Sequence, residues 1–175
     1  MSGSRERLLV AKGVLGPMGG AERDLIRILP SLNELFSVTM ATIQPSPELV
    51  EVCATNEIGL ITPESDWEVP RDALSTILDS GRDSASRAWG SCNGLEDAMT
   101  SAMALHLVSG DGSLPILDHV PPGLRVHLHL LEPHRGLYED VLHRRVDGSP
   151  RRNLTLTKAA LSRARSRDKA LIMDL

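Results

Sequence analysis

The sequence is poor in aromatic residues and in cysteine. Only 2% of its 175 residues are Phe, Trp or Tyr, so a core must be built from Leu, Ile, Val, Ala and Met. The two cysteines, Cys53 and Cys92, stand alone without metal-ligand spacing. This isolation indicates small buried thiols rather than metal ligands.

The chain also lacks a long apolar run. No stretch approaches the length of a membrane span, and the first residues, Met-Ser-Gly-Ser-Arg-Glu-Arg, contain no apolar core of a secretion signal. With 175 residues and a net charge of -4, the chain is long enough for one globular domain with a substantial core. We therefore expect a single cytoplasmic domain over residues 1–175.

Glycines gather between residues 13 and 23, in the order Gly-Val-Leu-Gly-Pro-Met-Gly-Gly-Ala-Glu-Arg. The segment follows an apolar run at 8–10 and precedes a helical pattern at 21–29, which predicts a strand, a turn and a helix. Such a turn lets backbone N–H groups approach an anion, and the helix N-terminus adds partial positive charge. A tight turn that needs glycine only for its backbone dihedrals explains the segment equally well.

Two common phosphate-binding motifs are missing. A dinucleotide fingerprint requires G-x-G-x-x-G and an acidic residue after the second strand, whereas this spacing is G-x-x-G-x-x-G-G and Gln44 and Pro45 follow the second predicted strand. A P-loop requires Gly-Lys-Ser or Gly-Lys-Thr, and neither tripeptide occurs in the sequence. These absences exclude both motifs.

Short apolar runs alternate with helical patterns along the chain. Strands are predicted at 8–10, 37–43, 59–61, 105–108 and 125–131. Helices are predicted at 21–29, 48–54, 70–78, 82–90, 95–103, 137–146 and 153–170. This alternation predicts an α/β fold: a Rossmann-like, doubly wound, mostly parallel sheet with helices on both faces.

Prolines, glycines and one capping pattern set the expected helix ends. Pro30 is expected to end or kink the first helix. Pro70 suits the first position of a helix that Gly81 stops. Asn93 and Glu96 have the three-residue spacing of a capping box, which predicts the start of a further helix.

Charge is distributed unevenly along the chain. Residues 48–79 are mostly acidic, and in the loop predicted at 62–69 we expect Trp67 to fold onto the surface. From Arg135 onward the chain is basic. A basic final helix suits contact with phosphates, anionic lipid or nucleic acid, but a solvated helix face is the favoured interpretation.

Histidines gather near the ends of the later strands. His127 and His129 are two residues apart and so share one strand face, while Glu132 and Arg135 follow in the next loop. His106 ends an earlier strand and can face the same crevice. Ligands bind at this end of a doubly wound sheet, where histidine serves as a general base and arginine holds a phosphate or carboxylate. For each histidine taken singly, a structural role is the alternative.

The same region offers a metal hypothesis. The candidate ligands are His127, His129 and Glu132, or Glu139 with His143 at helical i,i+4 spacing. No recognised zinc spacing occurs among them, so we expect no metal.

Two motifs, taken in order, resemble retaining glycosyltransferases of family four, which have the GT-B architecture. The predicted first strand and Gly-Pro-Met-Gly-Gly-Ala-Glu-Arg at 16–23 are similar to the element that opens the first helix of that family's amino-terminal domain. Residues 127–144 are similar to a later motif, in which a histidine-bearing strand leads into Glu-Pro-x-Arg and an aromatic-containing helix. The basic segment 158–175 resembles the long helix near the end of that domain.

The resemblance implies donor-side roles for the first motif. Gly19 and Gly20 would lie against the diphosphate of the donor, because the family places this element along the nucleotide-sugar cleft. Glu22 and Arg23 would cap and brace the turn.

The second motif implies acceptor-side roles. Many family members carry histidine where this chain has Leu131, and His129, on the same side of the strand by alternation, would take its place near the reacting sugar. Glu132 and Arg135 would shape the acceptor site.

The activity that the resemblance implies is transfer of a sugar, with retention, from a nucleoside diphosphate sugar to a sugar or lipid-linked acceptor, without a metal or other cofactor. Family members have a second, donor-binding domain with two glutamates seven residues apart, which this sequence lacks. We therefore expect an acceptor-side domain that is inactive alone and acts with a donor-binding domain or separate chain. The alternative is a non-catalytic module that binds a partner or a membrane surface through its basic final helix. Peripheral contact with the membrane suits both, and no nucleic-acid partner is expected.

Overall fold

The computed structural model describes residues 5–15, 20–68, 80–110 and 112–130. All of these residues except Ser80 and Gly81 belong to one compact unit, formed within 1–69 and 82–131. Outside the described residues lie Gly19, Glu132 and Arg135 of the predicted site, and the helices predicted at 70–78, 137–146 and 153–170.

Five parallel strands form the sheet of this unit. They are β1 (Arg7–Ala11), β2 (Ser37–Ala41), β3 (Gly59–Ile61), β4 (Ala104–Val108) and β5 (Arg125–His129). Their order across the sheet is β3-β2-β1-β4-β5, so the chain winds outward from β1 first in one direction and then in the other. This order confirms the predicted Rossmann-like, doubly wound α/β fold. All five predicted strands are present, although β2 and β5 end earlier than predicted.

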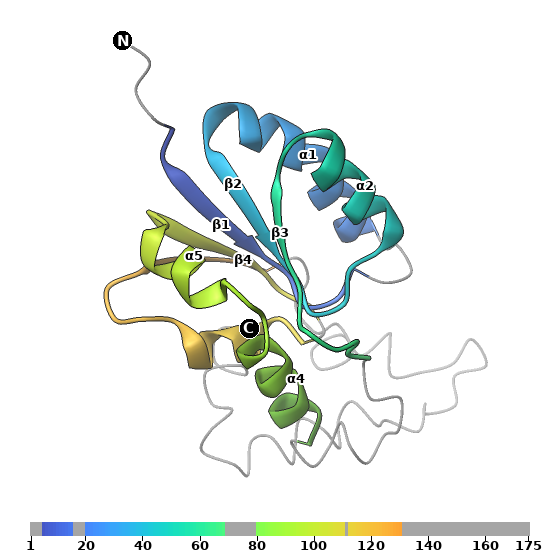
Figure 1. The fold of residues 1–175 in the computed structure, drawn as a ribbon, viewed down its shortest axis with the longest axis vertical. Helices are drawn as coiled ribbons and strands as arrows, with labels where there is room; N and C mark the ends of the chain where they lie inside the picture. Colours follow the sequence, from blue (N-terminus) through green and yellow to red (C-terminus); the bar gives the residue numbers. More distant parts are fainter. Residues whose placement is uncertain (1–4, 16–19, 69–79, 111, 131–175) are drawn as a thin grey trace, which may run out of the picture. The chain divides into compact units, whose positions relative to one another are not determined.

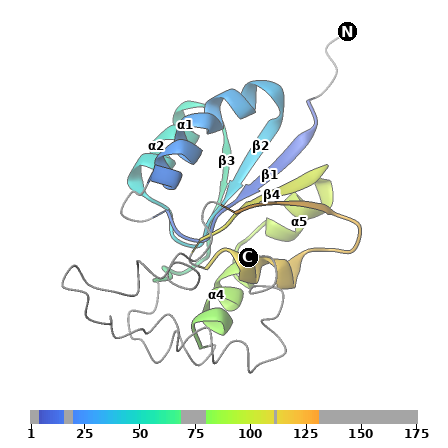
Figure 2. The same cartoon turned by 180° about the vertical axis from the view of Figure 1, so that it is seen from behind.

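Helices cover both faces of the sheet. Figure 1 shows α1 (Gly20–Leu35) and α2 (Pro47–Thr55) on one face and α4 (Ser80–Gly90) and α5 (Leu95–Ser101) on the other, and Figure 2 shows the same layers from behind. Alternate strand residues feed two apolar cores: Val10 packs in the cluster that contains Leu29 of α1, whereas Leu9 packs in the cluster that contains Trp89 of α4. A 3-10 turn, η1 (Leu114–His119), follows β4.

Pro30 does not end the first helix, so that half of the prediction that it ends or kinks the helix is wrong. α1 continues to Leu35 with Pro30 inside it. A proline within a helix removes one backbone hydrogen bond and costs about 3 kcal/mol. The buried apolar side of α1 offsets this cost, and Asn33, beyond the proline, accepts a hydrogen bond from the Val38 amide in β2.

The helix predicted at 48–54 is confirmed as α2. Ser46 caps it, because its side-chain Oγ accepts a hydrogen bond from the Leu49 amide. Pro47 occupies the first helical position, where the missing N–H has no intrahelical partner to lose.

Three local expectations are wrong. Gly81 lies inside α4 and does not stop a helix. Asn93 does not cap α5, because Gly94 precedes the helix in a left-handed conformation (φ 80°) and supplies no side-chain cap. The Asn93 amide instead donates to Glu64 Oε1 at 2.8 Å, next to a β-bridge that joins the two segments. Trp67, expected on the surface, is partly buried against the core on the α4 side of the sheet.

Both cysteines are buried free thiols, as predicted. Burial raises the pKa of Cys53 and raises the pKa of Cys92 to about 11. Both thiols therefore stay protonated near neutral pH, which makes them poor nucleophiles. Within the described part of the chain, no helix is long and apolar enough to cross a membrane.

Candidate functional site

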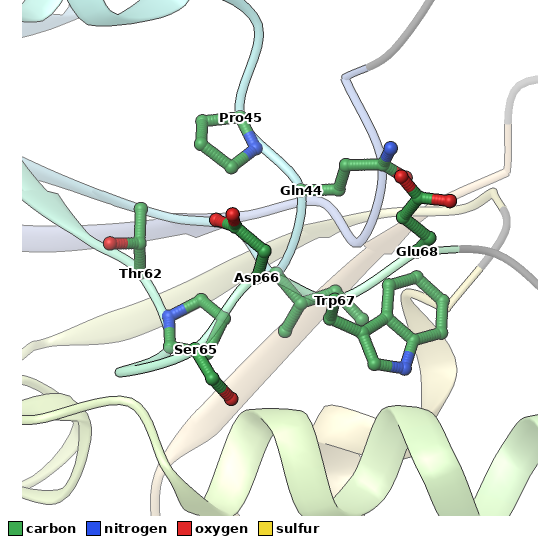
Figure 3. A pocket seen from close by; sticks show the side chains of 9 residues that line it. Gln44, Pro45, Thr62, Ser65, Asp66, Trp67 and Glu68 are labelled. Atoms are coloured by element: carbon green, nitrogen blue, oxygen red, sulfur yellow. The ribbon is translucent and has the colours of Figure 1, made fainter.

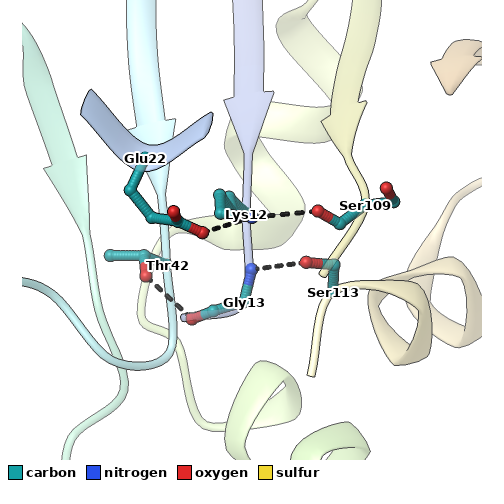
Figure 4. Close-up of polar contacts among 6 residues, drawn as sticks. All are labelled: Lys12, Gly13, Glu22, Thr42, Ser109 and Ser113. Carbon is teal, nitrogen blue, oxygen red and sulfur yellow. Dashed lines mark hydrogen bonds and ion pairs between the residues drawn. The ribbon is translucent and has the colours of Figure 1, made fainter. Parts of the chain in front are cut away.

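The carboxyl ends of β1, β2 and β4 meet at one edge of the sheet (Figure 4). The winding direction reverses between β1 and β4, because α1 leads from β1 to β2 whereas α4 and α5 precede β4 on the other side. Open α/β sheets bind their ligands in the crevice at such a reversal point. The residues that follow these three strands therefore form the candidate site.

Lys12, the residue after β1, is only 2% exposed. Its Nζ lies 3.2 Å from Glu22 Oε1 in the first turn of α1 and donates a hydrogen bond of 2.9 Å to the backbone oxygen of Ser109, after β4. A buried ammonium is costly unless it is paired and hydrogen-bonded. Lys12 therefore fixes the start of α1 and the end of β4 to the end of β1.

Buried hydroxyl groups hold both sides of Gly13, the next residue (Figure 4). The Gly13 N–H donates to Ser113 Oγ at 2.8 Å, and the Gly13 carbonyl accepts from Thr42 Oγ1 at 2.9 Å. Ser113 and Thr42 are both fully buried. Their hydrogen bonds fix the direction in which the chain leaves β1 toward the glycine-rich segment.

Three of the predicted donor-side residues, Gly20, Glu22 and Arg23, are described. Gly20 is the first residue of α1, and a Cβ added to it would meet no described atom within 4 Å. Within the described part, neither packing nor a left-handed backbone requires glycine at this position. Glu22 is paired with Lys12, whereas Arg23 is exposed to solvent.

A backbone link joins this corner to the predicted histidines. The carbonyl of Ser109 accepts from Lys12 Nζ, and its N–H donates to the backbone oxygen of His129 at 2.9 Å. His129 is the last residue of β5 and is exposed. Glu22, Lys12, Ser109 and His129 therefore form a continuous series of polar contacts along the carboxyl edge, from α1 to β5.

His106, His127 and His129 lie on one face of β4 and β5. The expectation that His106 ends its strand is wrong, because it is the middle residue of β4 (Ala104–Val108). The register pairs His106 with His127, and the Nδ1 atoms of these two rings are 2.7 Å apart. The ring centroid of His129 is 5.7 Å from that of His106. A hydrogen bond between two Nδ1 atoms needs one protonated and one bare nitrogen, so it persists only while at least one of the two rings is neutral.

The pKa of His106 is lowered from 6.5, first by burial and then by the neighbouring His127 and His129. Between this lowered value and 6.5, the unfolded chain binds more protons than the folded protein does. We therefore expect the free energy of unfolding to decrease as the pH falls through about 6.5. Urea unfolding of the wild type and of His106→Gln across this range measures the effect. An unchanged slope of stability against pH in the variant would contradict the assignment to His106.

His106 and His127 contact each other through their Nδ1 atoms. Among the residues that the structure places, no group of three or more His, Cys, Asp or Glu side chains is arranged to hold a metal. The 2.7 Å between His106 Nδ1 and His127 Nδ1 is also shorter than the roughly 3.3 Å expected between two nitrogen ligands of a tetrahedral zinc. Glu132, Glu139 and His143, which the metal hypothesis also used, lie outside the described residues.

Serine, aspartate and histidine side chains also meet between α4 and η1, a cluster that the sequence pattern did not predict. Ser86 Oγ donates to Asp118 Oδ2 at 3.2 Å, and His119 Nε2 lies 2.9 Å from the backbone oxygen of Ser86. The same Nε2 lies 3.4 Å from Ser86 Oγ. These contacts tie η1 to α4.

Sequence reasoning also missed Lys12, Thr42 and Ser109. Each is the polar residue that immediately follows an apolar strand, β1, β2 and β4 respectively. Their position directly after a predicted strand could have identified them from the sequence, because the carboxyl ends of parallel strands converge at one edge of the sheet.

No protein-family model matches the chain, and no curated protein or solved structure matches it either. The fold and the site geometry therefore define its class. It is a Rossmann-like, doubly wound α/β protein, and the buried polar residues of its described part are concentrated at the carboxyl edge of the sheet.

Proposed function

We propose that this chain is the acceptor-side domain of a retaining GT-B glycosyltransferase, which transfers a sugar from a nucleoside diphosphate sugar to an acceptor. The observation that carries the proposal is the polar series from Glu22 through Lys12 and Ser109 to His129. It places the opening of α1 and an exposed histidine along the same edge of the sheet. The resemblance of residues 16–23 and 127–144 to family four supports the same function.

In the proposed reaction, the bond between the anomeric carbon and the donor diphosphate breaks, and the acceptor hydroxyl oxygen bonds to that carbon on the same face. The hydroxyl proton leaves with the diphosphate. Negative charge develops on this leaving group, and backbone N–H groups in the first turn of α1 are suited to stabilise it. The pairing of Lys12 with Glu22 also supports the proposal, because an unpaired carboxylate there would repel the diphosphate.

The acceptor-side residues complete the proposal. His129, exposed at the end of β5, would contact the reacting sugar. Glu132 and Arg135, outside the described residues, would shape the acceptor site. The nucleoside diphosphate sugar is a substrate, and no cofactor is proposed.

A reconstitution assay tests this function. The chain is mixed with candidate donor-binding chains from the same genome, radiolabelled UDP- and GDP-hexoses, and lipid and glycan extracts as acceptors. Transfer is expected only when both chains are present, with the anomeric configuration of the donor retained. If neither a partner chain nor a longer form of this protein transfers sugar, the proposal is wrong.

Gly20→Ala separates a binding role of Gly20 from a folding role. The added methyl group meets no described atom, so folding stability is expected to stay constant or to rise by about 0.5 kcal/mol. The same methyl group would block close approach of a diphosphate, so UDP and GDP should bind at least about tenfold more weakly, a loss of about 1.4 kcal/mol. Amide NMR shifts of residues 20–22 during UDP and GDP titrations measure binding. Ser31→Ala, exposed in the same helix, is the control, and equal nucleotide affinity in both variants would contradict the role of Gly20.

A further inference from the structure

A pocket of about 230 Å³ lies at the carboxyl edge of the sheet, beside the candidate site (Figure 3). Within the described part of the chain, it is lined by residues 43–45, which follow β2, and by residues of the segment 62–68, which follows β3. This volume is below the roughly 300–1,000 Å³ of clefts that hold drug-sized ligands. The pocket therefore suits one ring system, or one end of a larger molecule.

Gln44 has a fixed backbone and an unsatisfied side chain in this pocket. Its N–H donates to the Gly13 carbonyl at 3.1 Å, and its carbonyl accepts from the Leu15 N–H at 3.0 Å. Its side-chain Oε1, in contrast, is buried and has no hydrogen-bond partner among the residues that the structure describes. A buried acceptor without a partner is unfavourable, so a ligand that brings an N–H or O–H donor would satisfy it.

The amide group of Gln44 also restricts the shape of the ligand. A glutamine side chain carries a carbonyl oxygen and an N–H₂ group side by side in one plane. The edge of a nucleobase presents a donor and an acceptor side by side in the same way, and glutamine binds such edges through paired hydrogen bonds. Gln44 therefore fits a base whose edge places an N–H group opposite Oε1.

Trp67 supplies a fixed aromatic surface in the same pocket. Its Nε1 donates to Ser84 Oγ of α4 at 2.8 Å, and its ring packs against the core on that side of the sheet. Gly112 lies against the ring edge, since a Cβ added there would be 3.1 Å from Trp67 Cη2. A ring held in this way loses little conformational freedom when a ligand binds. Bases of every kind stack on aromatic side chains.

The position of the pocket favours a nucleotide over a free sugar. The hydrogen bonds of Gln44 to Gly13 and Leu15 place the pocket next to the segment that leads into α1. The proposed function puts the donor diphosphate at the start of α1. A nucleoside diphosphate carries its base and its phosphates at opposite ends, so one molecule can occupy both places.

We propose that the pocket binds the base of the donor nucleotide, with Gln44 hydrogen-bonded to the edge of the base and Trp67 stacked on its ring. The assignment to the donor rests on the proposed function. Base binding itself is tested without sugar transfer, because a nucleoside carries the base and no phosphate.

Direct binding measurements use uridine and inosine, a pyrimidine and a purine nucleoside that each have a ring N–H. Saturation-transfer NMR and quenching of Trp fluorescence report binding, and Trp89 adds a constant background because it is fully buried. At least one nucleoside should bind with a Kd on the order of millimolar. Its N-methylated form, 3-methyluridine or 1-methylinosine, lacks the ring N–H and should bind about threefold or more weakly. D-glucose is the competing probe and should bind more weakly than this nucleoside.

Gln44→Met identifies the pocket as the binding site, because it removes the amide and keeps the length of the side chain. Nucleoside binding should weaken by about tenfold, and the preference over the methylated form should disappear. The midpoint of urea unfolding should not fall, since Oε1 has no partner to lose among the described residues. Glu51→Met, exposed in α2, is the control and should leave nucleoside binding unchanged.

Several results would overturn the inference. They are no saturable binding of either nucleoside at about 100 times the millimolar scale, no quenching of Trp fluorescence at saturation, equal binding of the methylated form, tighter binding of D-glucose, or unchanged nucleoside binding in Gln44→Met. A lowered urea midpoint in that variant would also contradict it, because Gln44 would then support the fold.

These results are distinguishable from failure of the proposed function. Nucleoside binding that depends on Gln44, without sugar transfer in any reconstituted pair, refutes the glycosyltransferase and the donor assignment but not the base pocket. Transfer by a reconstituted pair with an unchanged KM for the donor in Gln44→Met refutes the pocket alone.

Discussion

Glu22→Gln is expected to destabilise the protein by about 2–3 kcal/mol, because it leaves the buried ammonium of Lys12 without its counter-charge. The Lys12 side chain is 3% exposed and that of Glu22 is 20% exposed. Lys12→Met should cost less, about 1–2 kcal/mol, since water can reach the remaining carboxylate. The double variant should recover most of the loss, because it leaves no unpaired buried charge.

Urea unfolding at neutral pH gives these free energies, and the four proteins form a double-mutant cycle. Asp24→Asn is the matched control, because Asp24 lies in the same helix and forms an ion pair with Arg27 in which both side chains are largely exposed. Its effect should stay within about 0.5 kcal/mol. If Glu22→Gln changes stability no more than Asp24→Asn does, Lys12 is not held by a buried ion pair.

The ion pair between Lys12 and Glu22 should also affect nucleotide binding. Lys12 fixes the first turn of α1 relative to Ser109 and hence to His129. In the lysine-to-methionine variant, we expect faster amide exchange in the first turn of α1 and weaker UDP and GDP binding. A variant that binds nucleotides like the wild type would separate the role of Lys12 in folding from any role in the site.

Trp89→Ala is expected to cost about 3–5 kcal/mol, because it truncates the largest fully buried side chain among the described residues. Trp89 packs in the core between α4 and the sheet, and its Nε1 donates to the Gly112 carbonyl at 2.8 Å. Trp89→Phe should cost about 2 kcal/mol, because it retains most of the apolar contact and loses the hydrogen bond.

The loss of stability should extend to the candidate site. Gly112 directly precedes Ser113, and the Ser113 hydroxyl accepts a hydrogen bond from the Gly13 N–H. Hydrogen exchange in Trp89→Phe should therefore accelerate at Gly13. Leu35→Ala is the control, because Leu35 is a large apolar residue that is 70% exposed, and its effect should stay within about 0.5 kcal/mol. Unchanged exchange at Gly13 would mean that the tryptophan does not support the site.

Local pattern predicted the sheet well. The apolar runs ending at Val10 and Val108 each lie between polar or glycine-containing segments, and both form parallel strands. The helix predicted at 48–54 formed as α2, and its start depends on neighbouring residues alone, because Ser46 caps it and Pro47 lies in its first turn. Such signals can be read from sequence because the backbone conformation of these residues is set within a few positions.

The predictions from sequence were wrong where contacts with distant segments outweigh a local signal. Pro30 would end an isolated helix, but packing of α1 on the sheet outweighs one lost hydrogen bond. Asn93 has the spacing of a capping residue, yet its side-chain amide donates a hydrogen bond to Glu64. The loop after β3 lies next to Asn93, because Pro63 and Cys92 form a β-bridge. Local sequence rules give the conformations and hydrogen-bond partners that such residues can adopt, and tertiary contacts determine which of them forms.

The sequence by itself determined the α/β class and the shared face of His127 and His129, because these follow from hydrophobic periodicity and strand alternation. It also indicated the burial of both cysteines, because isolated thiols without metal-ligand spacing behave as small apolar groups. Only the tertiary structure decided that Lys12 meets Ser109, 97 positions away, and that Gly13 meets Ser113, 100 positions away. It also brought together the segments that follow β2 and β3, which line a pocket that includes Gln44 and Trp67 (Figure 3). Parallel strands gather their carboxyl ends from distant parts of the chain, so the order of strands in the sheet, rather than spacing in the sequence, places the residues of the site.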